Sequence, residues 1–144
     1  MSSKKHIDIL VIGSGPGGYA AAFRAADLGR KVIIVDKDPT LGGVCLNRGC
    51  IPSKTLLHIA KVLEETESLK KMGVSFAKPK VDINTVRDWK NKIIKQLSGG
   101  IAQMAKARKV ETIEGIATFI SNKEIQVERK SNKENITFDH CIIA

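Results

Sequence analysis

A glycine cluster between an apolar segment and an alanine-rich segment constrains the fold more than any other feature of this sequence. Residues 7–12 are almost uniformly apolar, which is typical of a strand buried on both faces of a parallel sheet. The cluster GSGPGG follows at residues 13–18, and residues 19–28 favour a helix that Gly29 can end. A second buried strand is predicted over residues 31–36, of which residues 32–35 are apolar. Strand, glycine turn, helix and strand in this order predict one right-handed βαβ unit.

The spacing Gly13-x-Gly15-x-x-Gly18 in this context is that of a dinucleotide-binding turn. Gly13 permits the tight turn, Gly15 lets a pyrophosphate approach the backbone, and Gly18 lets the helix pack closely against the sheet. The free N–H groups and the positive dipole of the helix N-terminus suit the phosphates. Asp36, which ends the second strand, can accept hydrogen bonds from both hydroxyls of an adenosine ribose. The pattern predicts a dinucleotide site without distinguishing FAD from NAD.

The composition is that of one compact domain, because 144 residues with 42% hydrophobic and 27% charged side chains can bury an ordinary core. No apolar run approaches the roughly 20 residues that span a bilayer. The N-terminus has the basic opening of a signal peptide, but its apolar run contains Asp8 and lacks a small-residue cleavage site, so we expect a cytoplasmic chain without a membrane segment. The net charge of +9 is scattered among acids, and only four Phe, one Tyr and one Trp could stack on bases. We therefore expect solvated helix faces rather than nucleic-acid binding.

Three cysteines are too few for a disulfide framework or a four-cysteine zinc site, and we predict no metal site. On a regular helix Cys45 and Cys50 would lie about 140° apart and ~7.5 Å along the axis, too far for a disulfide. A bond between them needs an irregular loop, which Asn47 and Gly49 can supply. A disulfide closing so small a ring in a reducing cytosol is more typical of a catalytic pair than of a structural one. Cys50 would also begin the next helix, where a thiolate is favoured.

Two helices are predicted after the cysteine loop. The first runs from Pro52 to about Lys71, and the second, capped by Asp82 or Asn84, runs to about Ala107. The short connection predicts an antiparallel pair. Three strands then follow as a meander that ends on a buried strand, at residues 110–120, 124–129 and 136–144.

These elements predict an α/β fold: a Rossmann-like, FAD/NAD(P)-binding parallel sheet with a βαβ start, a long helical pair and a three-stranded antiparallel meander. We divide the chain into a βαβ unit with its cysteine loop (residues 1–52), the helical pair (53–108), and the meander with its return strand (109–144).

The glycine turn, Asp36 and the run GGVCLNRGCIPSK at residues 42–54 together closely resemble the class I pyridine nucleotide-disulfide oxidoreductases. The resemblance covers the whole chain, since the helical pair, the turn at residues 115–117 and the closing CIIA also match. Leu46, Ile51, Ser53 and the following KTLLH are most similar to the members that oxidise dihydrolipoamide. Members that reduce glutathione disulfide or mercuric ion share the cysteine motif and remain alternatives, as does a truncated, non-catalytic dinucleotide-binding module.

The resemblance implies an incomplete FAD-binding domain, with the NAD-binding and dimer-interface domains of the complete enzyme absent from this sequence. Lys54 would place its ammonium near the flavin, and Gly115 and Ala117 would meet the adenine through backbone groups. The FAD contacts implied in this way are Gly13, Gly15, Gly18, Asp36, Lys37, Gly42, Gly43, Cys45, Lys54, Gly115 and Ala117.

The resemblance also implies redox chemistry at Cys45 and Cys50. Cys45 would exchange with dihydrolipoamide carried by lipoyl domains of the acyltransferases in 2-oxoacid dehydrogenase complexes, and the Cys50 thiolate would pass electrons to FAD. Hydride transfer to NAD would follow, in a complete enzyme that is a homodimer. Arg48 departs from the small apolar residue that is common in the family. We hypothesise that its charge depresses the pKa of a neighbouring thiol.

Overall fold

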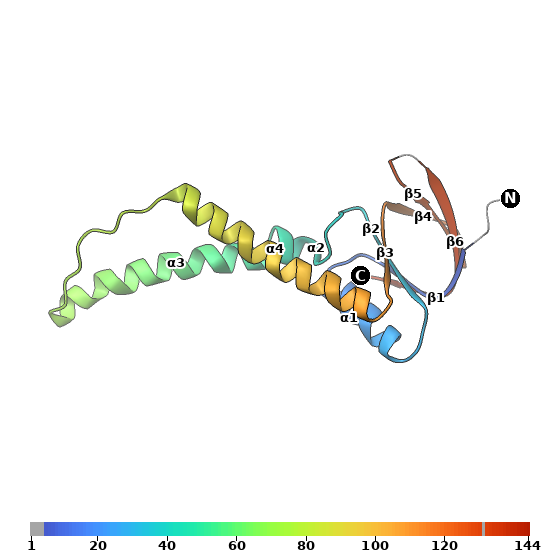
Figure 1. The fold of residues 1–144 in the computed structure, drawn as a ribbon, viewed down its shortest axis with the longest axis horizontal. Coiled ribbons are helices and arrows are strands. Elements are labelled where there is room, and N and C mark those ends of the chain that lie inside the picture. The colour runs from blue at the N-terminus through green and yellow to red at the C-terminus, as the bar shows by residue number, and fades with distance from the viewer. Residues whose placement is uncertain (1–4, 131) are drawn as a thin grey trace.

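A computed structural model describes residues 5–130 and 132–144, in which a six-stranded sheet carries a projecting helical hairpin (Figure 1). Residues 1–4 of the predicted first segment and Ser131 of the predicted meander lie outside this range. The sheet has the order β3-β2-β1-β6-β5-β4. The strands are β1 (Lys5–Ile12), β2 (Val32–Asp36), β3 (Glu111–Glu114), β4 (Ile116–Ser121), β5 (Glu124–Glu128) and β6 (Lys133–Ile143).

The βαβ unit is formed as predicted. Strand β1 pairs in parallel with β2 on one side and with β6 on the other, and helix α1 (Pro16–Asp27) connects β1 to β2. Gly29 follows the helix with φ +79°, the left-handed conformation expected of a terminating glycine. The Rossmann-like α/β class is therefore confirmed.

The first strands are apolar on both faces because each face packs against a separate core. Leu10 and Ile33 lie in one cluster, beneath the apolar residues of β5 and β6. Val11 and Ile34 lie in the other cluster, which α1 and the end of helix α4 (Ile83–Ala107) cover. Full burial of an aliphatic side chain contributes roughly 1.5–3 kcal/mol, so this two-sided packing fixes the part of the sheet that carries the glycine turn.

The segment predicted as one strand over residues 110–120 is two strands, and that prediction was wrong. Strand β3 pairs in parallel with β2, whereas β4 pairs antiparallel with β5. The chain changes partners at Gly115, whose N–H donates to the carbonyl of Asp36 at 2.8 Å. A side chain at residue 115 would lie 2.8 Å from the carbonyl oxygen of Glu128, so the change of partner requires glycine. Strands β4, β5 and β6 form the predicted antiparallel meander.

The helical pair consists of α3 (Cys50–Ser68), which continues as the 3₁₀ helix η1 (Leu69–Met72), and α4. The two helices extend from the sheet in Figure 1. Asp82 caps α4, because its carboxylate accepts the N–H groups of Asn84 at 2.9 Å and Thr85 at 3.2 Å. No residue of α3 is buried, so most of the hairpin surface is available to solvent or to further polypeptide.

The close approach of α1 to the sheet yields a test of the fold. A Cβ added at Gly18 would lie 2.0 Å from the carbonyl oxygen of Gly13, a backbone atom that cannot move without opening the turn. We expect Gly18→Ala to lower the free energy of unfolding by about 2–3 kcal/mol, measured by urea denaturation of the full-length protein.

Gly100→Ala is the matched control, because residue 100 is in the interior of α4 with open space around an added Cβ. It should raise stability by up to about 1 kcal/mol, the usual helix-propensity gain. Equal stability of the parent and Gly18→Ala proteins would contradict the packing described.

Candidate functional site

The glycine turn presents an uncapped helix N-terminus. Gly13 adopts φ +103° and donates its N–H to the carbonyl of Val35 at 2.9 Å, which fixes the turn above β2. Gly15 is the N-cap of α1, Pro16 begins the helix, and no side chain caps the first turn. An added Cβ at Gly15 would meet nothing within 4 Å. The first N–H groups of α1 are thus free to bind an anion that approaches over Gly15.

Asp36 is held at the end of β2 by backbone hydrogen bonds. Its Oδ2 accepts the N–H of Ser14 at 2.7 Å and its Oδ1 accepts the N–H of Asp38 at 2.9 Å. Partial burial raises the pKa of Asp36, but the hydrogen bonds from Asp38 and Ser14 and the charge of Lys37 outweigh burial and hold the pKa below its usual value. Asp36 is therefore a fixed, ionised acceptor with lone pairs left for a ligand.

A cavity of about 320 Å³ lies beside this carboxylate, at the carboxyl ends of β1 and β2. Open parallel sheets bind ligands at this position. Five residues predicted from the sequence line it, although they come from three separate segments of the chain. The lining residues are Ile12, Gly13, Val35, Asp36, Lys37, Gly115, Ile116 and Ala117.

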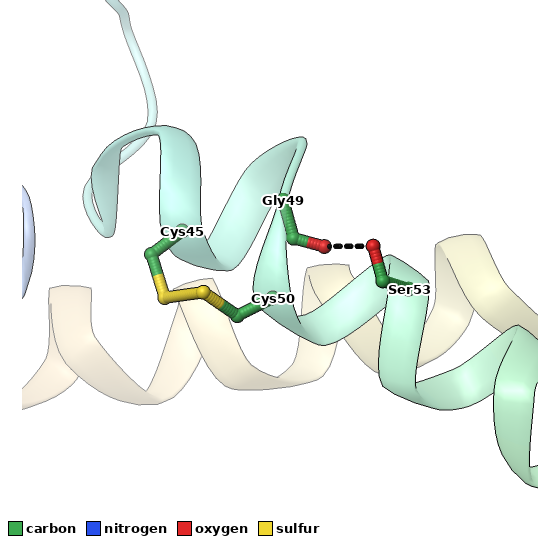
Figure 2. Close-up of a disulfide and its surroundings, with 4 residues drawn as sticks. All are labelled: Cys45, Gly49, Cys50 and Ser53. Atoms are coloured by element: carbon green, nitrogen blue, oxygen red, sulfur yellow. Dashed lines mark hydrogen bonds between the residues drawn. A yellow bond between two sulfur atoms is a disulfide. The ribbon is translucent and has the colours of Figure 1, made fainter.

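The two motif cysteines form a disulfide across an irregular junction between two helices (Figure 2). Cys45 lies in the short helix α2 (Gly43–Asn47), and Cys50 is the first residue of α3. Arg48 and Gly49 interrupt the helices, with φ/ψ of −137°/−5° and −122°/−102°, and this brings the two Cα atoms to 4.8 Å. Cys45 is half-buried and Cys50 is exposed. The predicted irregular loop is correct at Gly49, whereas helix α2 was not predicted.

The loop that carries the cysteines meets the glycine turn backbone to backbone. Gly42 donates its N–H to the carbonyl of Ser14 at 2.9 Å. Gly43 is so close that an added Cβ would lie 2.7 Å from Cα of Gly15. Both glycines have positive φ, +114° and +60°, which other residues rarely adopt. The disulfide and the dinucleotide turn therefore belong to one site.

Lys54 is a predicted site residue that does not line the cavity beside Asp36. It lies on α3, one turn after Cys50, and its side chain is exposed. Sequence reasoning gave no role to Asp38, named Asn47 only as a residue that could supply the irregular loop, and did not predict a partner for Arg48. All three residues make contacts that hold the cysteine loop in place. Arg48 pairs with Asp38 at 2.5 Å, and the Asn47 amide donates to the carbonyls of Thr40 and Leu41. Contacts between two segments of one irregular loop leave no periodic signal in a sequence.

Two negative findings apply to residues 5–130 and 132–144. No cluster of three or more metal-binding side chains occurs among them. No helix in this part of the chain is long and apolar enough to cross a membrane.

The fold and the site together define a Rossmann-like dinucleotide-binding domain with a disulfide on the segment that packs against its glycine turn. The family model described as pyridine nucleotide-disulphide oxidoreductase matches residues 7–144, and the chain belongs to this family.

Curated relatives match over essentially the whole chain. The chain is 51% identical to a dihydrolipoyl dehydrogenase of Vibrio cholerae over 144 residues and 49% identical to that of Haemophilus influenzae over 145 residues, each covering 100% of the chain. Identity to the dihydrolipoyl dehydrogenase of Bacillus subtilis is 44% over 137 residues, or 95% of the chain. The chain spans about 30% of the length of the Vibrio cholerae and Haemophilus influenzae proteins.

Family membership implies FAD on this domain, and the residues present fit such a group. The free helix N-terminus and the open space at Gly15 suit a pyrophosphate, and the fixed carboxylate of Asp36 suits a ribose. Gly115 and Ala117 line the same cavity as Asp36.

Substitution of Gly15 tests this fit. Gly15 has φ −67°, which alanine adopts freely, so Gly15→Ala should leave stability within about 0.5 kcal/mol of the parent. The new methyl would stand where the pyrophosphate approaches, and we expect FAD affinity to fall roughly 10- to 100-fold. Titration of apoprotein with FAD, followed by flavin fluorescence, measures the change. A stable Gly15→Ala protein with parental affinity would show that the pyrophosphate binds elsewhere.

Proposed function

We propose that this chain is the FAD-binding and disulfide-bearing part of a dihydrolipoyl dehydrogenase, and that the complete enzyme oxidises protein-bound dihydrolipoamide to lipoamide. One observation carries the proposal: the Cys45–Cys50 disulfide stands on a loop in backbone contact with the dinucleotide-binding turn. The names of the relatives support the choice of substrate over glutathione disulfide or mercuric ion.

The thiol chemistry uses two steps at the disulfide. A substrate thiolate attacks Sγ of Cys45, so that a mixed disulfide forms and the Cys45–Cys50 bond breaks with release of the Cys50 thiolate. The second substrate thiol then displaces Cys45, which leaves lipoamide and a reduced cysteine pair. Cys50 begins the 19-residue helix α3, whose N-terminal dipole favours the thiolate. The assignment of these roles to Cys45 and Cys50 follows the resemblance to the family.

The remaining predicted residues would hold the cofactor. When bound, FAD accepts two electrons from a dithiol and delivers them as a hydride to NAD. Asp36 would orient the ribose, the turn at Gly13 to Gly18 would bind the pyrophosphate, and Lys54 would extend its ammonium toward the flavin. The contacts that we propose are Gly13, Gly15, Gly18, Asp36, Lys37, Gly42, Gly43, Cys45, Lys54, Gly115 and Ala117.

The partners and location are part of the same proposal. We infer a homodimeric, cytoplasmic enzyme that receives lipoyl domains from the acyltransferases of 2-oxoacid dehydrogenase complexes. Residues 1–52 would then supply the cofactor turn and the disulfide, residues 53–108 the helical pair, and residues 109–144 the meander and return strand. NAD binding would belong to polypeptide beyond this chain.

Cysteine substitutions in the full-length protein test the function. Cys45→Ser and Cys50→Ser should each lower dihydrolipoamide-dependent reduction of NAD by at least about a thousandfold, since both sulfurs are needed for disulfide exchange. Cys141→Ser is the matched control, because Cys141 lies in β6 outside the disulfide, and it should keep the parental rate. Parallel assays with glutathione disulfide and mercuric ion address the alternatives. If the protein turned over either compound and not dihydrolipoamide, the proposed substrate would be wrong.

A further inference from the structure

The turn between the two cysteines is fastened to the loop that follows Asp36. Nη2 of Arg48 lies 2.5 Å from Oδ2 of Asp38, and Nη1 lies 3.5 Å from Oδ1, so the guanidinium faces the carboxylate with both amino groups. The neighbouring Asn47 amide donates to the carbonyls of Thr40 and Leu41, at 3.3 Å each. We refer to Asp38, Asn47 and Arg48 as the clasp.

The clasp acts on the segment that the disulfide depends on. Arg48 and Gly49 are the two residues between α2 and α3, and their non-helical conformations bring Cys45 and Cys50 together. A continuous helix would separate these cysteines beyond bonding distance. Whatever holds Arg48 in place therefore also holds the geometry of the redox pair.

The other side of the clasp is itself anchored. The N–H of Asp38 donates to Oδ1 of Asp36, and Asp36 accepts the N–H of Ser14 from the glycine turn. The Asp38 side chain is 24% exposed, which limits screening by water, whereas that of Arg48 is 56% exposed. The turn between the cysteines is thus tied to the end of β2 rather than to a mobile surface group.

The pairing also changes the electrostatic role expected of Arg48. A cation paired at 2.5 Å with a carboxylate contributes little net field at a third group, because the two charges nearly cancel. The structure shows Arg48 as the partner of Asp38, which points to a role through position.

We propose that Arg48, together with Asp38, is a positioning residue for the redox pair, which keeps Cys45 and Cys50 in bonding geometry in the dithiol state and so favours reformation of the disulfide. The inference rests on the proposed function only in requiring that the pair cycles between dithiol and disulfide. It adds a residue that acts through the shape of the turn rather than through contact with substrate or cofactor.

The equilibrium between dithiol and disulfide measures this directly. Reduced dithiothreitol gives two electrons and two protons to the Cys45–Cys50 bond and becomes its own cyclic disulfide, so buffers of known ratio fix the equilibrium constant. The full-length protein is equilibrated without oxygen and quenched with acid, and its free thiols are alkylated and counted by mass spectrometry. Arg48→Met and Asp38→Asn should each lower the equilibrium constant for disulfide formation by about two- to fivefold, the range that a half-exposed ion pair supplies.

The directions in which Arg48→Met and Asp38→Asn shift the dithiol–disulfide equilibrium distinguish a positioning role from a direct electrostatic effect of Arg48 on the thiols. If the clasp acts by position, both substitutions shift the equilibrium in the same direction, the double variant is no worse than either single variant, and exchange of the two charges (Asp38→Arg with Arg48→Asp) restores part of the loss. If Arg48 acts by its charge on the thiols, Arg48→Met raises the pKa of the thiols while Asp38→Asn lowers it. Opposite shifts, or no shift in either variant, would overturn the proposal.

Two further proteins complete the design. Lys61→Met breaks an exposed ion pair with Glu65 on α3, away from the turn, and should leave the equilibrium unchanged. Arg48→Lys keeps the charge but loses the planar fork, so it should give an intermediate shift even if the methionine variant fails to fold. Turnover of dihydrolipoamide is assayed separately. If the parent protein fails that assay but the variants show the expected thiol equilibria, the proposed substrate is refuted and the role of the clasp stands.

Discussion

The site depends on a backbone contact between two glycine-containing segments. One is the glycine turn before α1, and the other leads into the helix that carries Cys45. Gly43, at the start of the helix that carries Cys45, lies against Gly15 of the dinucleotide-binding turn, and the N–H of Gly42 donates to the carbonyl of Ser14. A side chain at Gly43 would force the segments apart. Because neither segment can move away without breaking these contacts, the segment that carries the disulfide is held against the glycine turn.

Two helix N-termini lie at this junction, and each suits a different chemical group. Helix α1 begins beneath the open space at Gly15, where its free N–H groups suit phosphate. Helix α3 begins at Cys50, where the same dipole favours a thiolate. In the proposed function, one physical effect would thus serve both the binding of a dinucleotide and the activation of a sulfur. The contact of Gly43 with Gly15 holds the two helix starts near each other.

The sequence predicted the parts of this arrangement that depend on periodicity or on local backbone requirements. The apolar run of β1, the glycine turn, the Asp82 cap and the meander all have signals within a few neighbouring residues. The strand pattern missed the change of partner at Gly115, because residues 110–120 are almost continuously strand-like. The family resemblance marked a turn at residues 115–117, but the neighbours Asp36 and Glu128 show why the chain changes partner there. The clasp was missed for a similar reason, since Asp38 and Arg48 meet across an irregular loop.

The central claim is that a flavin and the Cys45–Cys50 disulfide share one site, and anaerobic reduction of the full-length protein with dihydrolipoamide tests it most directly. We predict a yellow protein whose first two electrons open the disulfide while the flavin stays oxidised. Absorption should then extend to longer wavelength, because the Cys50 thiolate would lie beside an electron-poor ring in the proposed site, and Cys50→Ser should lack this feature. A colourless protein, or a flavin that bleaches from the first addition without the long-wavelength absorption, would contradict the account.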